Sequence, residues 1–149
     1  MDYIAQTDEV GSSCNVVTLC NALRFFGKPS PVPGSPEFHE LRVLSGALHG
    51  TALNSMLDKV ALKVGLIRKP LPSHEERTDF DIRVFPVDLT VVNPTQGCCL
   101  HSILVIGQEP EGLVMVNYRC DKGPLVEIGW PDLASAAHNR KCWTFTLAQ

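Results

Sequence analysis

The stretch GSSCNVVTLCNALRFFG, residues 11–27, places a cysteine directly after Gly-Ser-Ser, at the expected start of a helix. Ser12 or Ser13 suits the N-cap, and Gly27 suits the residue that follows the helix. Apolar residues recur between them with helical spacing, which predicts an amphipathic helix with one buried face. An unpaired cysteine is often a small buried residue, but a helix N-terminus also favours the thiolate. Cys14 is therefore either a core residue or a nucleophile.

Helices are expected in the first half of the chain and strands in the second. A proline-rich loop at 28–36 separates the first helix from further helices at 37–47 and about 49–65, the latter with Thr51 as its cap. Residues 67–81 are polar and contain proline, so we expect a surface connection there. Runs rich in β-branched residues predict strands at 82–92, 100–108, 112–119, 125–130 and 142–148. This order predicts a single α+β domain spanning 1–149, in which N-terminal helices pack on an antiparallel β-sheet.

Composition excludes several classes of protein. The chain has 149 residues, 44% hydrophobic and 19% charged, with a formal net charge of −3. Its basic residues are scattered, whereas nucleic-acid binding favours a clustered basic face. Its apolar runs are far shorter than the roughly 20 residues that span a bilayer. The acidic start MDYIAQTDEVGSS does not resemble a signal peptide. We therefore expect a cytoplasmic protein with no nucleic-acid partner and no membrane insertion.

Six cysteines could suggest disulfides or a metal site. Without an export signal, disulfides are not expected, and no pair has the Cys-x-x-Cys spacing of a zinc site. We predict no metal and no cofactor. Five of the cysteines are interpreted as small buried residues: Cys20, Cys98, Cys99, Cys120 and Cys142.

A nucleophilic Cys14 would need a base and a third group that orients the base. Of five histidines, His101 is distinctive because it opens the apolar strand HSILVIG. The turn QEPEG then folds the chain back, so that Asn117 is expected close to His101. The alternative, a core cysteine plus a histidine at a sheet edge, stays open on these grounds. The other four histidines are expected to face solvent: His39, His49, His74 and His138.

These stretches resemble the papain-fold cysteine peptidases that process double-glycine bacteriocin leaders, together with related stand-alone domains. In that family a nucleophilic cysteine starts a helix that reaches a glycine thirteen residues later, as Cys14 and Gly27 do here. A Gly-Thr/Ser-x-Leu helix start and a Gly-Leu end follow, which HGTALNSMLDKVALKVGL resembles. The family's histidine opens a hydrophobic strand, and its Asp or Asn follows about sixteen residues later, as Asn117 follows His101. The resemblance covers roughly residues 6–120 and implies a papain-like fold with a Cys-His-Asn triad.

Two positions depart from the family pattern. The family carries a glutamine about six residues before the cysteine, whose amide helps to bind the oxyanion. Asp8 occupies that position here, and a carboxylate would repel the developing charge, so we assign the oxyanion role to Gln6, eight residues before Cys14. The second departure is Asn117, where leader peptidases more often have aspartate. Asparagine orients the histidine but adds no negative charge.

The resemblance implies an enzyme that hydrolyses a peptide or isopeptide bond through an acyl-enzyme on Cys14, with His101 as base. Its partner would then be a peptide or protein substrate. The same triad can deamidate glutamine or transfer an acyl group, and these remain alternatives. A different class is an inactive module that only binds a peptide. Such modules typically lose the cysteine, whereas this chain has Cys14, His101 and Asn117 together.

Overall fold

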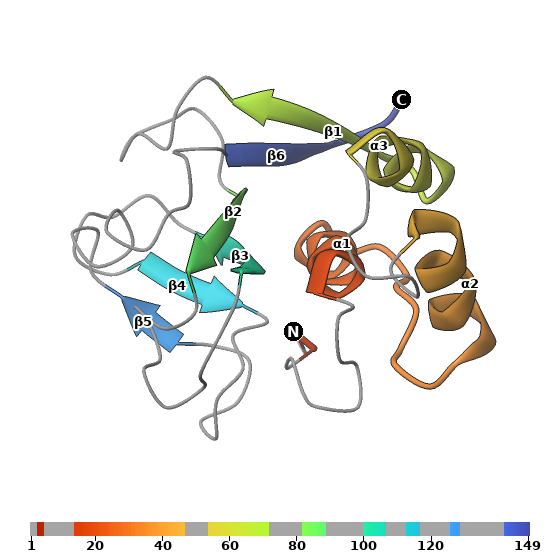
Figure 1. Ribbon diagram of the computed structural model, residues 1–149, viewed down its shortest axis with the longest axis horizontal. Coiled ribbons are helices and arrows are strands. Elements are labelled where there is room, and N and C mark those ends of the chain that lie inside the picture. Colours follow the sequence, from red (N-terminus) through yellow and green to blue (C-terminus); the bar gives the residue numbers. More distant parts are fainter. Residues whose placement is uncertain are drawn as a thin grey trace.

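The computed structural model describes residues 3–4, 14–46, 54–71, 82–88, 100–106, 113–116, 126–128 and 142–149. Within these ranges lie three helices, α1 (Cys14–Phe25), α2 (Pro36–Ser45) and α3 (Asn54–Lys63). Six strands accompany them, β1 (Leu66–Leu71), β2 (Ile82–Asp88), β3 (Leu100–Ile106), β4 (Leu113–Val116), β5 (Val126–Ile128) and β6 (Cys142–Leu147). The expected order of helices before strands is confirmed (Figure 1).

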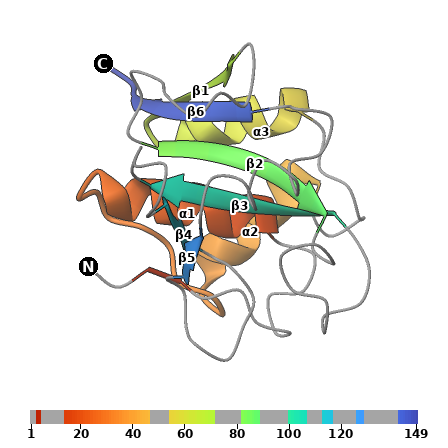
Figure 2. The ribbon, with the colours of Figure 1, turned by 90° about the vertical axis from the view of Figure 1, so that its left-hand side faces the viewer.

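The six strands form one antiparallel sheet in the order β1-β6-β2-β3-β4-β5. The last strand, β6, lies inside the sheet, between β1 and β2. The helices cover one face, and α1 lies between the sheet and α2 (Figures 1 and 2). The fold is therefore α+β, with helices packed on an antiparallel sheet.

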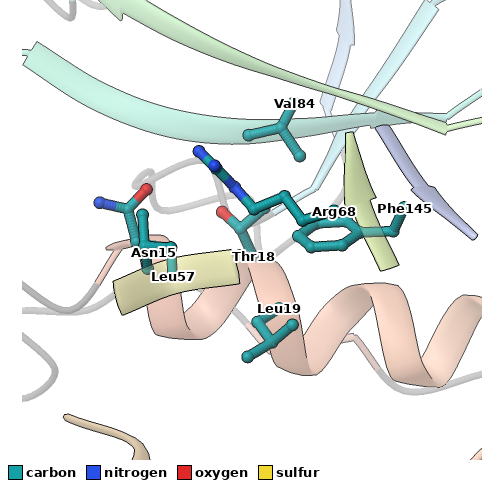
Figure 3. A pocket seen from close by; sticks show the side chains of 7 residues that line it. All are labelled: Asn15, Thr18, Leu19, Leu57, Arg68, Val84 and Phe145. Carbon is teal, nitrogen blue, oxygen red and sulfur yellow. The ribbon is translucent and has the colours of Figure 1, made fainter. Parts of the chain in front are cut away.

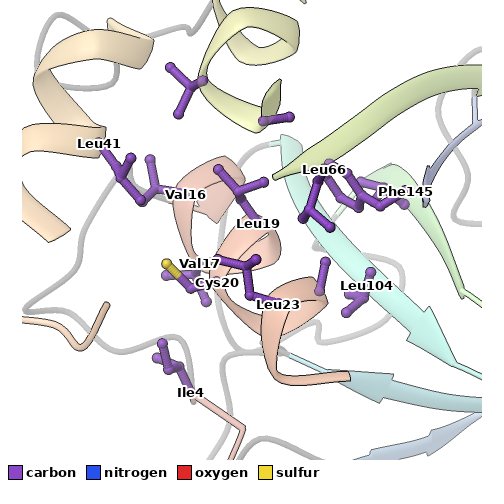
Figure 4. Packing of buried hydrophobic residues seen from close by; sticks show 14 of the residues in the cluster. Ile4, Val16, Val17, Leu19, Cys20, Leu23, Leu41, Leu66, Leu104 and Phe145 are labelled. Carbon is purple, nitrogen blue, oxygen red and sulfur yellow. The ribbon is translucent and has the colours of Figure 1, made fainter. Parts of the chain in front are cut away.

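Helix α1 is the centre of the core. All eight residues from Val16 to Leu23 are buried, so the expectation of a single buried face is wrong. The helix is enclosed because the sheet covers one side and α2 another; Val16 points towards Leu41 of α2, and Leu19 towards strands β1 and β6 (Figure 4). Two polar residues of this stretch, Thr18 and Asn21, are buried with the apolar ones.

The C-terminus of α1 and the two other helices follow the sequence signals. Gly27 has φ +70°, and the N–H groups of Gly27 and Lys28 donate to the carbonyls of Arg24 and Leu23, as in a Schellman motif. Ser35 caps α2 by accepting from the N–H of Phe38. The expected caps Ser12, Ser13 and Thr51 lie outside the described residues.

Strand β1 corrects the sequence-based expectation of a surface connection at 67–81. Residues 66–71 pair with β6 along their whole length, from Leu66 with Leu147 to Leu71 with Cys142. In the sequence, its charged residues and Pro70 are more typical of a surface loop than of a strand. A proline is tolerated there because β1 is an edge strand of the sheet. Residues 72–81 lie outside the described part of the chain.

The core joins α1 to both neighbouring layers. Side chains from α2, α3, β1, β2, β3 and β6 pack around it (Figure 4). The main buried cluster consists of Ile4, Val16, Val17, Leu19, Cys20, Ala22, Leu23, Phe38, Leu41, Val60, Ala61, Leu66, Ile82, Val84, Leu104 and Phe145. The packing fixes the N-terminal end of α1 relative to the strands.

Candidate active site

Cys14 is the first residue of α1 and is partly exposed. Its thiol is not part of a disulfide. At this position it adjoins the backbone N–H groups of the first helical turn, whose partial positive charge favours a thiolate. The structure therefore places Cys14 where a nucleophile can be reached.

The two other described cysteines are buried and poorly suited to nucleophilic chemistry. Burial raises the pKa of Cys20 to about 11, against smaller lowering effects of a hydrogen bond from Ser30 and the charge of Arg24. Burial also raises the pKa of Cys142 to about 12. Both are core residues, as predicted. Cys98, Cys99 and Cys120 lie outside the described residues.

The first turn of α1 lies against the start of β3. The hydroxyl of Thr18 donates to the carbonyl of Cys14 at 2.7 Å and lies 3.4 Å from the carbonyl oxygen of Ser102. Ser102 directly follows His101, whose backbone is paired with Val87 of β2. The chain thus brings the backbone of the cysteine's turn close to the end of β3 that carries the histidine.

A second contact holds the N-terminal segment on α1. The side-chain oxygen of Asn21 accepts from the N–H of Ile4 at 2.8 Å, and its amide nitrogen donates to the Ile4 carbonyl at 3.1 Å. Asn21 is fully buried, and Ile4 is only 9% exposed. Sequence reasoning missed this contact, although a polar residue in the middle of a buried helix was the available signal.

A small pocket opens beside the N-terminal turns of α1. Asn15 and Thr18 reach it from the helix, and Arg68 reaches it from β1 (Figure 3). The remaining lining residues are apolar: Leu19, Leu57, Val84 and Phe145. The pocket therefore combines an apolar wall with polar groups from two elements.

Arg68 was also missed, because it falls in the segment expected to be a surface connection. Its guanidinium donates to Asp58 and to Asn54, both at 2.9 Å, and lies 4.6 Å from the centre of the Trp143 ring. Only 7% of its side chain is exposed. Burial lowers the pKa of Arg68, and the hydrogen bond and charge of Asp58 oppose that shift. Arg68 links β1 to α3 and to β6.

Comparison with solved structures finds matches of similar length, among them three peptidase structures. A double glycine motif protease from an AMS/PCAT transporter, crystallised in complex with its leader peptide, matches with a TM-score of 0.69 and 15% identity, over 97% of this chain and 91% of that one. The peptidase domain of Streptococcus ComA, a bifunctional ABC transporter of a quorum-sensing pathway, matches with a TM-score of 0.72 and 14% identity, over 98% and 97%. The peptidase domain of Streptococcus mutans ComA matches with a TM-score of 0.60 and 10% identity, over 98% of this chain and 99% of that one. The chain has the fold of a double-glycine leader peptidase domain.

This papain-like fold was predicted from the sequence resemblance and is confirmed. No protein-family model matches the sequence, and no curated protein matches it either. At identities of 10–15% the structural likeness shows the fold alone.

Three of the four predicted site residues have no described side chain. The backbone of His101 is described, within β3, whereas Asn117 and Gln6 lie outside the described residues, as does Asp8. His39 is exposed on α2, as expected, and the other three histidines expected at the surface lie outside the described part. Cys14 is the site residue whose surroundings the structure shows.

Neither a metal site nor a membrane span is found in the described ranges. There, no group of three His, Cys, Asp or Glu side chains is arranged to hold a metal ion. No helix of that part is both long and apolar enough to cross a membrane.

Proposed function

We propose that the protein is a thiol-dependent peptidase that hydrolyses a peptide or isopeptide bond through an acyl-enzyme on Cys14, with His101 as base. The observation that carries the proposal is the placement of a partly exposed cysteine at the start of α1, with its helical turn against the residue that follows His101. The fold, shared with leader peptidase domains, supports the same assignment.

The proposed reaction begins with attack of the Cys14 thiolate on a carbonyl carbon. A C–S bond forms, and the carbonyl π-electron pair moves to the oxygen. The tetrahedral intermediate then collapses, the C–N bond breaks, and protonated His101 gives its proton to the leaving amine. In the second half, His101 takes a proton from water, and the hydroxide displaces Cys14, releasing the carboxylic acid.

Asn117 is proposed to orient His101. The pairing of Leu104 with Val116 ends the described β3–β4 ladder one residue before Asn117. Asn117 directly follows Val116 in the sequence, and Leu104, the partner of Val116, lies on the strand that carries His101.

Gln6 is proposed to bind the oxyanion together with the backbone N–H of Cys14. The bonds between Asn21 and Ile4 hold the chain two residues before Gln6. Asn21 lies seven residues along α1 from Cys14, or about 10 Å at the helical rise. Gln6 follows Ile4 by two residues in the sequence, and this closeness to a segment held on α1 supports the proposed role.

A peptide is the proposed substrate, because the AMS/PCAT protease of the same fold was crystallised with a leader peptide. We also place the protein in the cytoplasm, whose reducing environment keeps Cys14 as a thiol.

The test measures alkylation of Cys14 by limiting iodoacetamide across pH, with peptide mass mapping. We expect Cys14 to label faster than every other cysteine, with an apparent pKa below the unperturbed value of about 8.5. His101→Ala should remove that advantage, whereas His39→Ala, which alters an exposed histidine on α2, should not. An inert Cys14, or one indifferent to His101→Ala, would contradict the proposal.

The reaction type is then tested with peptides containing a Gly-Gly bond and with peptides containing internal glutamine. Cleavage that is lost in Cys14→Ala supports a peptidase. Ammonia release from glutamine without cleavage would instead identify a deamidase.

A further inference from the structure

Thr18 is a polar residue at the contact between α1 and β3. It is 1% exposed, yet its hydroxyl is close to two carbonyl oxygens from distant parts of the chain. One belongs to Cys14, at 2.7 Å, and the other to Ser102, at 3.4 Å and 84 residues away in sequence. The first is the residue proposed as nucleophile, and the second follows the residue proposed as base.

The Thr18 hydroxyl has one hydrogen, and the two distances indicate that it is donated to the Cys14 carbonyl. At 2.7 Å the bond to Cys14 has ideal O–H···O length, whereas the 3.4 Å approach to Ser102 is a longer, secondary contact.

We propose that Thr18 is a positioning residue, whose hydroxyl sets the spacing between the first turn of α1 and the start of β3, and through it the spacing of Cys14 and His101. This inference rests on the proposed function, because it assigns a consequence to the Cys14–His101 pair. A threonine that bonds the carbonyl four residues earlier is common in helices and can be merely local. The approach of the same hydroxyl to the Ser102 carbonyl of β3 is the contact that connects α1 to β3.

Three substitutions separate the hydroxyl from the volume of the side chain. Thr18→Val keeps the shape and removes the hydroxyl, and Thr18→Ser keeps the hydroxyl. Thr144→Val is the matched control, because Thr144 is also fully buried and its hydroxyl donates to a main-chain carbonyl, that of Ile82, at 2.8 Å. That bond joins β6 to β2 and touches neither Cys14 nor β3.

The measurement is the pH profile of Cys14 alkylation by iodoacetamide on the full chain, with wild type and His101→Ala as the two reference profiles. We expect Thr18→Val to raise the apparent pKa of Cys14 towards that of His101→Ala. Each unit of that rise slows alkylation below the pKa by about tenfold. The alkylation rate of Cys14 in Thr18→Ser should stay within about twofold of the wild-type rate, because serine keeps the hydroxyl. A twofold change corresponds to about 0.3 pKa unit. Thr144→Val should keep the wild-type pH profile of alkylation, even if urea unfolding shows that it loses as much stability as Thr18→Val.

The inference is overturned if Thr18→Val keeps the wild-type profile while His101→Ala changes it, because the hydroxyl is then only structural. It is also overturned if Thr18→Ser behaves like Thr18→Val. If Thr18→Val does not fold, Thr18→Ala replaces it, and the comparison of Ala with Ser isolates the hydroxyl. If wild type and His101→Ala have the same profile, the proposed function fails and the inference falls with it. That outcome is recognised without any Thr18 variant.

Discussion

Asn21 holds the N-terminal segment on α1 through two hydrogen bonds to the backbone of Ile4. In Asn21→Ala both bonds are lost, each contributing about 1 kcal/mol. If Ile4 stays in place, its N–H and carbonyl are left buried without these partners, at a cost of about 1–3 kcal/mol each. If the segment is released instead, burial of the Ile4 side chain is lost, about 2 kcal/mol, and regained chain freedom offsets part of this.

The cheaper route is release of the segment, so we expect Asn21→Ala to lower the free energy of unfolding by about 2–3 kcal/mol. For a domain of this size that corresponds to a fall in Tm of roughly 4–12 °C. Urea unfolding followed by circular dichroism measures the first quantity, and a thermal melt measures the second.

A double-mutant cycle with Ile4→Ala decides between the two routes. If the segment is released, Ile4→Ala destabilises the wild type but has little further effect on Asn21→Ala. The reasoning is refuted if Asn21→Ala costs less than about 0.5 kcal/mol, the usual range for surface substitutions. It is also refuted if Ile4→Ala costs the same in both backgrounds.

Two further predictions concern the buried thiols and the arginine of β1. Cys20 and Cys142 have pKa values of about 11 and about 12 in the folded state, above the unfolded value of about 8.5. Above pH 9 the unfolded chain therefore binds fewer protons than the folded one, and the free energy of unfolding should fall as pH rises towards 11. Urea unfolding at pH 8 and 10 measures this fall. The double variant Cys20→Ala/Cys142→Val should show a smaller dependence on pH. Arg68→Ala should cost about 2 kcal/mol, because it removes a buried side chain that stacks on the Trp143 ring and donates hydrogen bonds to Asn54 and Asp58. Lys63→Ala, which removes an exposed ion pair, should cost less than about 0.5 kcal/mol; equal losses in urea unfolding would contradict this comparison.

The local signals in the sequence identified α1 and the residue at its start. A cysteine after small residues, apolar spacing and a terminal glycine are all local features; the structure confirms the helix and shows Cys14 partly exposed at its start. The fold class followed from the order of the elements and from the family resemblance.

Contacts between distant residues could not be predicted in this way. Strand β1 looked like a connection because its identity depends on pairing with β6, where Leu66 meets Leu147. The roles of Thr18 and Asn21 depend equally on partners outside the helix. Helical spacing alone identifies neither role, because each side chain uses its polar group to bond main chain inside the core.

The position of β6 has a consequence for how the protein is made. Strand β1 pairs with β6, and β6 separates β1 from β2, although β1 and β2 precede it by more than fifty residues. The sheet therefore cannot assemble in the order in which the chain leaves the ribosome. Until β6 is synthesised, β1 lacks the one strand with which it pairs in the described sheet. The apolar side chains that β6 later covers then face water or a chaperone. The sheet is expected to be slow to nucleate, since the pairing of β1 with β6 closes a long stretch of chain.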